Sequence, residues 1–390
     1  MWQAIPSATR EELRGLGGDR WLLKFSVVAP LAFALLFVAI FWSGTPRELP
    51  IAIVDLDRGH MARSFVRYLD ASPTLMVSDH FDSVASGKSA IVDGSYYALV
   101  VIPADIERSV RLGQSPTITA FFNAQYLLIA KTIRSALLEI GMTVAVEADI
   151  ARILVGTPNF SEAFAIASPV RTEIGSLYNQ NLDYSQFLVP GIVFSMFQVL
   201  VSCVAVLVVS REFRWGGVGY WSRYGALPGL TGKMLPYTLI FSAQLMLLFF
   251  GFFGVLGWPY HAGLLAILPL LVFFVFACQT LGAFFYALTL NPERALGFAG
   301  AFSAPAFAFL GLTYPSSDMS SFAQFWRELM PAAHLADVYT ARISYGAGVG
   351  TFALPALIFV AHLLLIPFVV ERIQLQVEDH NEPTRSTNGA

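Results

Sequence analysis

The sequence predicts an α-helical integral membrane protein with six transmembrane helices and an inserted α/β domain outside the cytoplasm. Only 13% of its 390 residues are charged and 56% are hydrophobic, whereas soluble domains carry roughly 25% charged residues. Long runs of the chain contain no charged residue, and one segment, 44–183, has the composition of a soluble domain. These observations place most of the chain in lipid and one domain in water.

The uncharged runs locate the transmembrane helices. Asp, Glu, Lys and Arg are absent from 25–46, 184–210, 234–292, 295–317 and 343–370. A helix needs roughly 20 apolar residues to cross a bilayer, and the third run is long enough for two spans with a turn at Gly257–Pro259. We therefore expect six spans, near 23–43, 186–209, 235–256, 264–288, 297–313 and 349–370. The first is read as an uncleaved anchor, because no convincing cleavage site follows it and many spans do.

The distribution of basic residues orients these spans. Cytoplasmic loops carry an excess of Lys and Arg. The basic residues of the N-terminal segment and of alternate loops are Arg10, Arg14, Arg20, Lys24, Arg211, Arg214, Arg223, Lys233, Arg294 and Arg372. On the other side, the third-to-fourth turn has none and 314–348 has only Arg327 and Arg342. Both termini are therefore predicted to be cytoplasmic.

This orientation divides the chain into five parts. They are a cytoplasmic N-terminal interface segment (1–22), a first transmembrane helix (23–43), an extracytoplasmic α/β domain with a long helix (44–183), the five-helix remainder of the transmembrane domain (184–371) and a cytoplasmic tail (372–390). Within 44–183, short β-rich runs alternate with helical ones. Strands are expected at 49–56, 74–78, 96–102 and 117–122, and helices at 61–69, 81–91, 104–112 and 125–155. A small α/β domain on a helical stalk follows from that order.

The chain contains no site that could supply energy for transport. A phosphate-binding P-loop needs a Gly, four residues and then Gly-Lys-Ser/Thr; around Gly232-Lys233, Leu227 and Met234 occupy the first and last of these positions. Ion-coupled carriers keep ionisable groups inside the membrane, yet between their edges the predicted spans contain only His362. We therefore expect a transport permease that is not itself an enzyme, with no catalytic residue, no cofactor and no metal site in this chain. Any energy must come from another subunit.

Three smaller features have structural interpretations. Cys203 and Cys278 lie in apolar runs and are expected to be packing residues without a disulfide. Asp55–Gly59 weakly resembles a calcium-binding loop but lacks the later ligands, so a turn is expected. The net charge of −3 gives no reason to expect a nucleic-acid partner.

The loop 210–233 allows two interpretations from its residues alone. It begins with charged residues, Arg211, Glu212 and Arg214, that alternate with the aromatic residues Phe213 and Trp215. A short amphipathic helix of this kind could insert into a cleft on a partner protein. It could equally lie at the membrane surface with its aromatic rings at the level of the lipid headgroups.

Four groups of residues follow one another between the spans. They are Pro50–Asp57 with Tyr97–Pro103, Leu177–Asn179 with Tyr184 and Phe187–Gly191, Arg211-Glu212 with Gly216 and Gly232-Lys233, and Met330–His334. In this order and spacing they resemble the permease subunits of ABC transporters of the type-two exporter class. The similarity is greatest to the drug-exporter-like branch with a large extracytoplasmic domain.

The resemblance implies particular roles for these residues. The coupling loop 210–233 would contact a cytoplasmic ATPase through Arg211, Glu212, Phe213, Arg214, Trp215, Gly216 and Lys233. Pro190, Gly191, Pro331 and His334 would have gating or structural roles, and His334 could either gate a substrate or form a hydrogen bond near the outer interface. A re-entrant segment, 318–346, would precede the last span without crossing the membrane.

The resemblance also implies a function and partners. The chain would be the permease of an ATP-driven exporter in the cell inner membrane and would form the path for small hydrophobic or amphipathic compounds. Its partners would be ABC ATPase subunits that bind the ATP, a second copy or a sibling permease, membrane lipid and a periplasmic adaptor. Two alternatives are export of a lipid or glycan by the same machinery, and a membrane receptor or scaffold that transports nothing.

Overall fold

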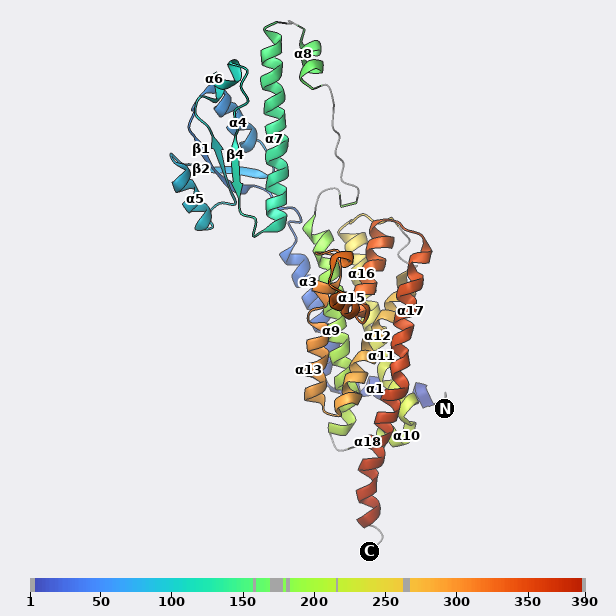
Figure 1. Ribbon diagram of the computed structural model, residues 1–390. Helices are drawn as coiled ribbons and strands as arrows, with labels where there is room; N and C mark the ends of the chain where they lie inside the picture. The colour runs from blue at the N-terminus through green and yellow to red at the C-terminus, as the bar shows by residue number, and fades with distance from the viewer. Residues whose placement is uncertain are drawn as a thin grey trace. The chain divides into compact units, whose positions relative to one another are not determined.

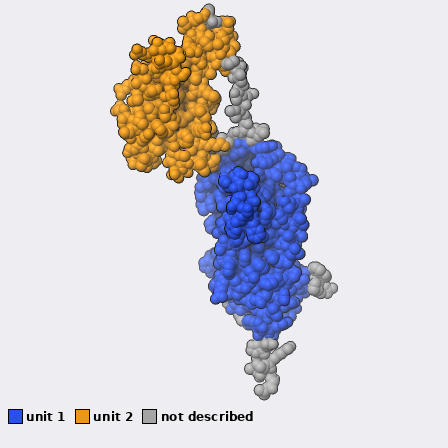
Figure 2. Space-filling model, in the orientation of Figure 1, with its two compact units in different colours: residues 1–44, 176–390 blue, residues 45–175 orange. Residues whose placement is uncertain are grey.

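A computed structural model describes residues 4–156, 159–168, 178–179, 183–214, 217–261 and 267–387. The chain divides into two compact units (Figure 2). The first, here called the helical unit, contains residues 1–44 and 176–390; the second, here called the α/β unit, contains residues 45–175. The predicted domain boundary at 44–183 lies close to these limits.

The helical unit is dominated by long apolar helices (Figure 1). Among the described residues, five are long and apolar enough to cross a membrane: Arg20–Ile40, Tyr184–Arg214, Ala226–Val255, Leu268–Thr289 and Val349–Asn381. The first comprises α2 (Arg20–Leu23), a π-helical turn (Lys24–Val28) and α3 (Ala29–Ile40); the next three are α9 (Tyr184–Arg214), α11 (Ala226–Phe250, with a π-helical end at Gly251–Val255) and α12 (Leu268–Thr289). The last comprises α17 (Ala353–His362) and α18 (Ile366–Thr387), between 3-10 turns at Val349–Phe352 and Leu363–Leu365. These helices overlap five of the six predicted spans.

The remaining predicted span, 297–313, is a broken helix. Here the chain forms α13 (Pro292–Ser303) and the short α14 (Ala306–Phe309). Pro305 stands between them, and proline both lacks an N–H donor and clashes with the preceding helical turn. With 12 residues, α13 is about 18 Å long, well short of the roughly 30 Å hydrocarbon core of a bilayer. A sixth crossing therefore stays a prediction.

The predicted re-entrant segment 318–346 contains two short helices. A 3-10 turn (Ser316–Asp318) precedes α15 (Ser321–Glu328) and α16 (Pro331–Val338), and a π-helical turn (Tyr339–Ser344) follows. Each helix has 8 residues, about 12 Å, and is too short to cross a bilayer. Gln198 of α9 accepts a hydrogen bond from the backbone N–H of Ala332 at 2.8 Å, so it satisfies a free donor at the start of α16.

Neutral polar side chains join the apolar helices to one another. The amide of Gln279 on α12 accepts from the hydroxyl of Thr238 at 2.7 Å and donates to the carbonyl of Met234 on α11 at 3.2 Å. Gln244 of α11 donates to the carbonyls of Ser26 and Val27 in the first span, both at 3.0 Å. Such contacts between membrane helices contribute about 0.6–2 kcal/mol each. Their role in this chain is to fix which helices are neighbours.

The α/β unit is built on a four-stranded sheet in the order β2-β1-β3-β4. The strands are β1 (Leu49–Asp55), β2 (Leu75–His80), β3 (Ala98–Ile102) and β4 (Thr119–Phe122). Strand β1 pairs in parallel with β2 and β3, and β4 is antiparallel to β3. The two central strands are buried on both faces, as expected for parallel strands between layers of helices.

Helices cover both faces of this sheet (Figure 1). They are α4 (His60–Asp70), α5 (Val84–Val92), α6 (Ile106–Arg111) and the long α7 (Leu127–Leu154), whereas α8 (Phe160–Ala167) packs against α7 and not against the sheet. From β1 the chain reaches β2 on one side through α4, and it then returns past β1 to β3 on the other side through α5. Right-handed crossovers in opposite directions place the two helices on opposite faces, and α4 and α5 do pack in separate apolar clusters on the two faces.

The turn after β1 is held by its own aspartates. The carboxylate of Asp55 accepts from the backbone N–H groups of Asp57 and Arg58 at 3.0 and 2.8 Å. Asp57 in turn accepts from the N–H of Ile106 at 3.0 Å and so caps α6. Both carboxylates therefore accept hydrogen bonds from backbone N–H groups, and the prediction of a turn is confirmed.

The helices α9 and α12 approach each other closely at Gly282. Gly282 of α12 lies directly against the backbone of Ser202 on α9, where an added Cβ would collide with the Ser202 carbonyl. We expect Gly282→Ala to lower stability by about 1–3 kcal/mol, because backbone on both sides must shift. Gly297→Ala in α13 is the control, since a Cβ there meets nothing within 4 Å. Thermal unfolding of the purified protein would contradict this packing if the two variants melted alike.

Candidate functional site

The N-terminal helix α1 (Ala4–Gly18) packs closely against the start of α11. Gly232 makes this approach possible, because a Cβ at that position would collide with the side chain of Ala8. Ala8, Glu12 and Leu16 are all buried and follow one another at intervals of four residues, so they form one face of α1. Packing of this face carries a carboxylate, that of Glu12, into the interior.

Glu12 is the centre of a buried charge cluster. Its side chain has 0% exposure. One carboxylate oxygen, Oε2, lies 2.6 Å from Nη2 of Arg211 on α9 and 3.0 Å from Nζ of Lys233 on α11. The other, Oε1, accepts from the hydroxyl of Tyr237 at 2.8 Å. Three separate helices are thereby joined through one carboxylate.

Lys233 has a second set of partners. Its Nζ atom lies 2.8 Å from Oε1 of Glu212 and 4.2 Å from the centre of the Tyr220 ring, and its side chain is fully buried. We call Glu12, Arg211, Glu212, Lys233 and Tyr237 the Glu12 cluster. Its two carboxylates balance its two cations, which is the condition under which buried charges are tolerated.

A shorter helix, α10 (Gly219–Tyr224), adds contacts beside the cluster. The carboxylate of Glu11 accepts from Arg223 at 3.1 Å and from the Tyr224 hydroxyl at 2.7 Å. The Tyr220 hydroxyl donates to the carbonyl of Gly229 at 3.0 Å, and burial raises the pKa of Tyr220, so this proton is retained. The ion pair of Glu11 is exposed and contributes little to stability.

Phe213 belongs to a separate stack of aromatic rings at the end of α9. Its ring lies 5.9 Å from that of Trp221 and 6.1 Å from that of Tyr286, both nearly parallel to it. The ring of His380, in the C-terminal helix α18, lies 6.0 Å away. The stack thus ties the end of α9 to α10, α12 and α18.

The structure brings together some of the residues predicted from the coupling loop. Arg211, Glu212 and Lys233 meet in the Glu12 cluster, and the half-buried Phe213 packs against other aromatic rings. The contact of Arg211, Glu212 and Phe213 with a partner stays a prediction; within the chain these side chains contact other helices. Arg214 is exposed. Trp215 and Gly216 lie outside the described residues.

The predicted gating residues have structural contacts. Pro190 is buried within α9, and a Cβ on the neighbouring Gly191 would collide with the side chain of Leu312. Pro331 begins α16, as is common for proline. His334 is buried, its Nε2 atom lies 3.0 Å from the carbonyl oxygen of Glu328, and burial lowers its pKa. His334 therefore forms a hydrogen bond within the chain, and its role as a gating or structural residue stays a prediction.

The sequence analysis missed Glu11, Glu12, Tyr220 and Tyr237. One signal was present: Glu11 and Glu12 are adjacent acids in an otherwise basic N-terminal segment, where Glu12 continues an apolar face. Its partners are 199 and 221 residues away, so no local pattern could identify them. Among the described residues no group of His, Cys, Asp and Glu could hold a metal ion.

Comparison with known proteins gives one match. A family model described as "ABC-2 family transporter protein" matches residues 20–370. This range includes all of α9–α17, the whole α/β unit and four of the five residues of the Glu12 cluster. No curated protein matches the chain significantly.

Neutralising Glu12 should strongly destabilise the helical unit. Glu12→Gln leaves two buried cations with one carboxylate, and removal of one partner from a buried ion pair costs about 3–5 kcal/mol. Glu12→Gln combined with Lys233→Met should recover part of this loss, because one cation is removed as well. Glu11→Gln is the matched control and should cost at most about 1 kcal/mol, since its ion pair is exposed. Equal melting temperatures for the two single variants would contradict the assignment.

Proposed function

This chain belongs to the ABC-2 transporter family and is a multi-pass membrane permease; we propose that it exports small hydrophobic or amphipathic compounds and that a separate ATPase subunit drives it. One observation carries the proposal: the only dense group of charges on α9 and α11 lies near one end of each helix, in the Glu12 cluster. The membrane-crossing parts of the described helices are almost free of ionisable side chains. A proton or sodium gradient needs such groups within the membrane, so the proposal assigns the work to a protein that acts at the helix ends.

The Glu12 cluster is suited to transmit such work. A partner that moves the connection between α9 and α11 also moves α1, because Arg211 and Lys233 both bind Glu12. From α1 the chain continues directly into the first span, through Asp19, whose carboxylate caps the N–H groups of Trp21 and Leu22 at 3.1 and 3.0 Å. The first, second and third candidate spans would then move together. Rigid elements with buried, fully paired contacts are what mechanical coupling needs.

The proposed assembly contains two permease chains and two ATPase subunits. Lys and Arg in the short loops support cytoplasmic termini in the cell inner membrane, with the α/β unit on the other side, where an adaptor could bind. Among the members of the predicted coupling set that the structure describes, Arg214 is the exposed one, so we assign the ATPase contact to its surroundings and to α10. Within this proposal, that surface is held in position by the ion pairs of Arg211, Glu212 and Lys233 in the Glu12 cluster.

Transport should require hydrolysis of ATP by the companion subunit. In sealed proteoliposomes that contain the permease and the ATPase, we expect amphipathic fluorescent dyes to be moved when ATP is present and not when a non-hydrolysable analogue replaces it. The permease alone should move nothing, with or without a proton gradient. Movement by the permease alone would contradict the proposal. If only lipid-linked material stimulates ATP hydrolysis, the result would point to lipid or glycan export. If the permease purifies without any associated ATPase, the result would point to a receptor or scaffold.

Charge reversal at Arg214 should weaken binding of the ATPase without affecting folding. Arg214 is exposed and contributes nothing to the Glu12 cluster, whereas reversal of a charge at an interface commonly costs at least 1.4 kcal/mol, or about tenfold in affinity. We therefore expect about tenfold less ATPase to co-purify with Arg214→Glu. Arg294→Glu is the control, because Arg294 is also exposed and lies in a loop predicted on the same side. An equal effect of both variants would reject a specific contact at Arg214.

A further inference from the structure

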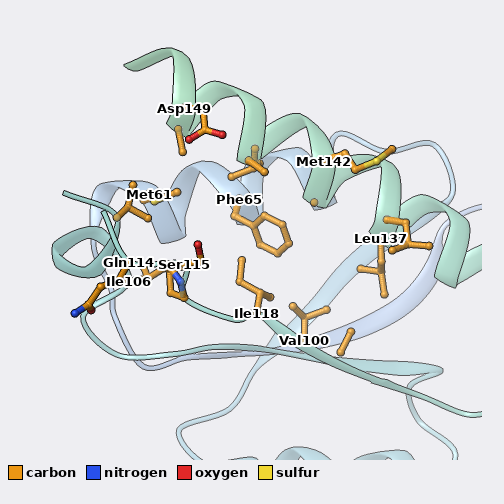
Figure 3. Close-up of a pocket in the computed structure, with 18 of the residues that line it drawn as sticks. Met61, Phe65, Val100, Ile106, Gln114, Ser115, Ile118, Leu137, Met142 and Asp149 are labelled. Atoms are coloured by element: carbon orange, nitrogen blue, oxygen red, sulfur yellow. The ribbon is translucent and has the colours of Figure 1, made fainter. Parts of the chain in front are cut away.

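The α/β unit contains a groove that the permease architecture does not explain. Its volume is about 650 Å³, and it lies between α7 and one face of the sheet (Figure 3). Alternate residues of the segment that forms β4, namely Ile118, Ala120 and Phe122, form part of its floor. Val100 of β3, which pairs with Ala120, and Phe65 of α4 continue this apolar surface. The volume is within the range of roughly 300–1,000 Å³ that is usual for small-molecule sites.

Helix α7 supplies the long wall of the groove. Residues that line it recur along one face of α7 from Arg134 to Arg152, a separation of 18 positions and therefore about 27 Å. Between Arg134 and Asp149 every lining residue on this helix is apolar or glycine. The site is consequently long, narrow and apolar along its middle, with charged side chains only toward its ends.

The apolar wall is left uncovered by the rest of the unit. Leu138 and Met142 are 57% and 61% exposed although both face the groove. Between them, Gly141 has open space around it, because a Cβ there would meet nothing within 4 Å. Exposed apolar strips of this kind mark binding sites more often than chance exposure does. Methionine also adapts its shape to different apolar partners.

The charges of the groove distinguish its two ends. Arg134, Asp149 and Arg152 are its only charged lining residues. Asp149 and Arg152 form an ion pair at 3.2 Å, so their charges cancel. Within the described part of the chain, Arg134 has no ion-pair partner. The groove therefore has one unbalanced positive charge at one end, and an anionic group is complementary to it.

We propose that this groove binds a single-chain amphiphilic anion. Its acidic headgroup would pair with Arg134, and its alkyl chain would lie against Leu138, Gly141 and Met142. A compact aromatic compound would leave much of a groove about 27 Å long empty. An amphiphilic cation would be repelled by the unbalanced positive charge of Arg134. Binding here is independent of the energy source for transport, so this site stands apart from the proposed ATP-driven export.

The site can be tested on the full chain in lipid nanodiscs. The probe is dodecanoate with a photoreactive diazirine in its alkyl chain, and labelled positions are mapped by mass spectrometry. We expect saturable labelling on α7 around Leu138–Met142 and on the adjacent strand segment 118–122. The same chain with a trimethylammonium headgroup should label these peptides about fivefold less.

Three variants separate the contributions of shape and charge. Gly141→Leu should reduce groove labelling about tenfold, because its side chain fills the open space while leucine favours the helix more than glycine does. Gly141→Ala is the matched control and should label as the wild type does. Arg134→Gln should reduce labelling by the anion about fivefold and raise labelling by the cation, because it removes both the attraction of the anion and the repulsion of the cation.

Several outcomes would overturn the proposal. They are labelling confined to the helical unit, equal labelling by the two headgroups, or labelling that Gly141→Leu leaves intact. If Gly141→Leu does not fold, as judged by gel filtration, Met142→Asp at an exposed position replaces it and should likewise reduce labelling about tenfold. Loss of labelling would leave ATP-dependent dye transport to be measured separately, so failure of one hypothesis does not decide the other.

Discussion

The placement of one carboxylate organises the helical unit. A charge removed from water must be balanced nearby, since a buried charge without a partner costs several kcal/mol. Glu12 meets this requirement with Arg211, Lys233 and Tyr237, and Lys233 meets its own with Glu212 as well. These contacts determine where α1 packs against α11, how far apart α9 and α11 lie, and where α10 lies. Elsewhere in the unit, the buried Arg327 pairs with Asp337, and the amide of Gln279 is bonded through both its oxygen and its nitrogen.

The two kinds of polar contact have different consequences. Amide and hydroxyl bonds between helices are weak and local, so they specify neighbours without fixing them rigidly. In the Glu12 cluster, removal of any one charged side chain leaves a buried charge without its partner, which lowers stability by several kcal/mol. A chain built in this way has a stiff end, where α1, α9 and α11 meet, and a part within lipid where helices are held mainly by packing. This arrangement is consistent with the proposed ATPase contact near that end.

Much of the fold could be predicted from the sequence, because its signals are local. The charge-free runs located five candidate spans, and the alternation of β-rich and helical segments located all four strands and α4–α7. The broken helix near 297–313 was missed because hydropathy does not register the break at Pro305. For the candidate site, the sequence singled out Arg211, Glu212 and Lys233 and predicted a contact with a partner, which stays a prediction. It did not identify Glu12, which binds Arg211 and Lys233 from about two hundred residues away, because a pairing at that separation does not alter the local composition.

That separation also affects how the protein is made. Chains emerge from the ribosome N-terminus first, at about 5–20 residues per second, and Glu12 is synthesised 199 residues before Arg211 and 221 before Lys233. For tens of seconds α1 therefore has a carboxylate and no cation to meet it. The helix must wait in a hydrated position and can dock only after α11 has been inserted. Although α1 is synthesised before α9 and α11, it can take its final place only after both of them.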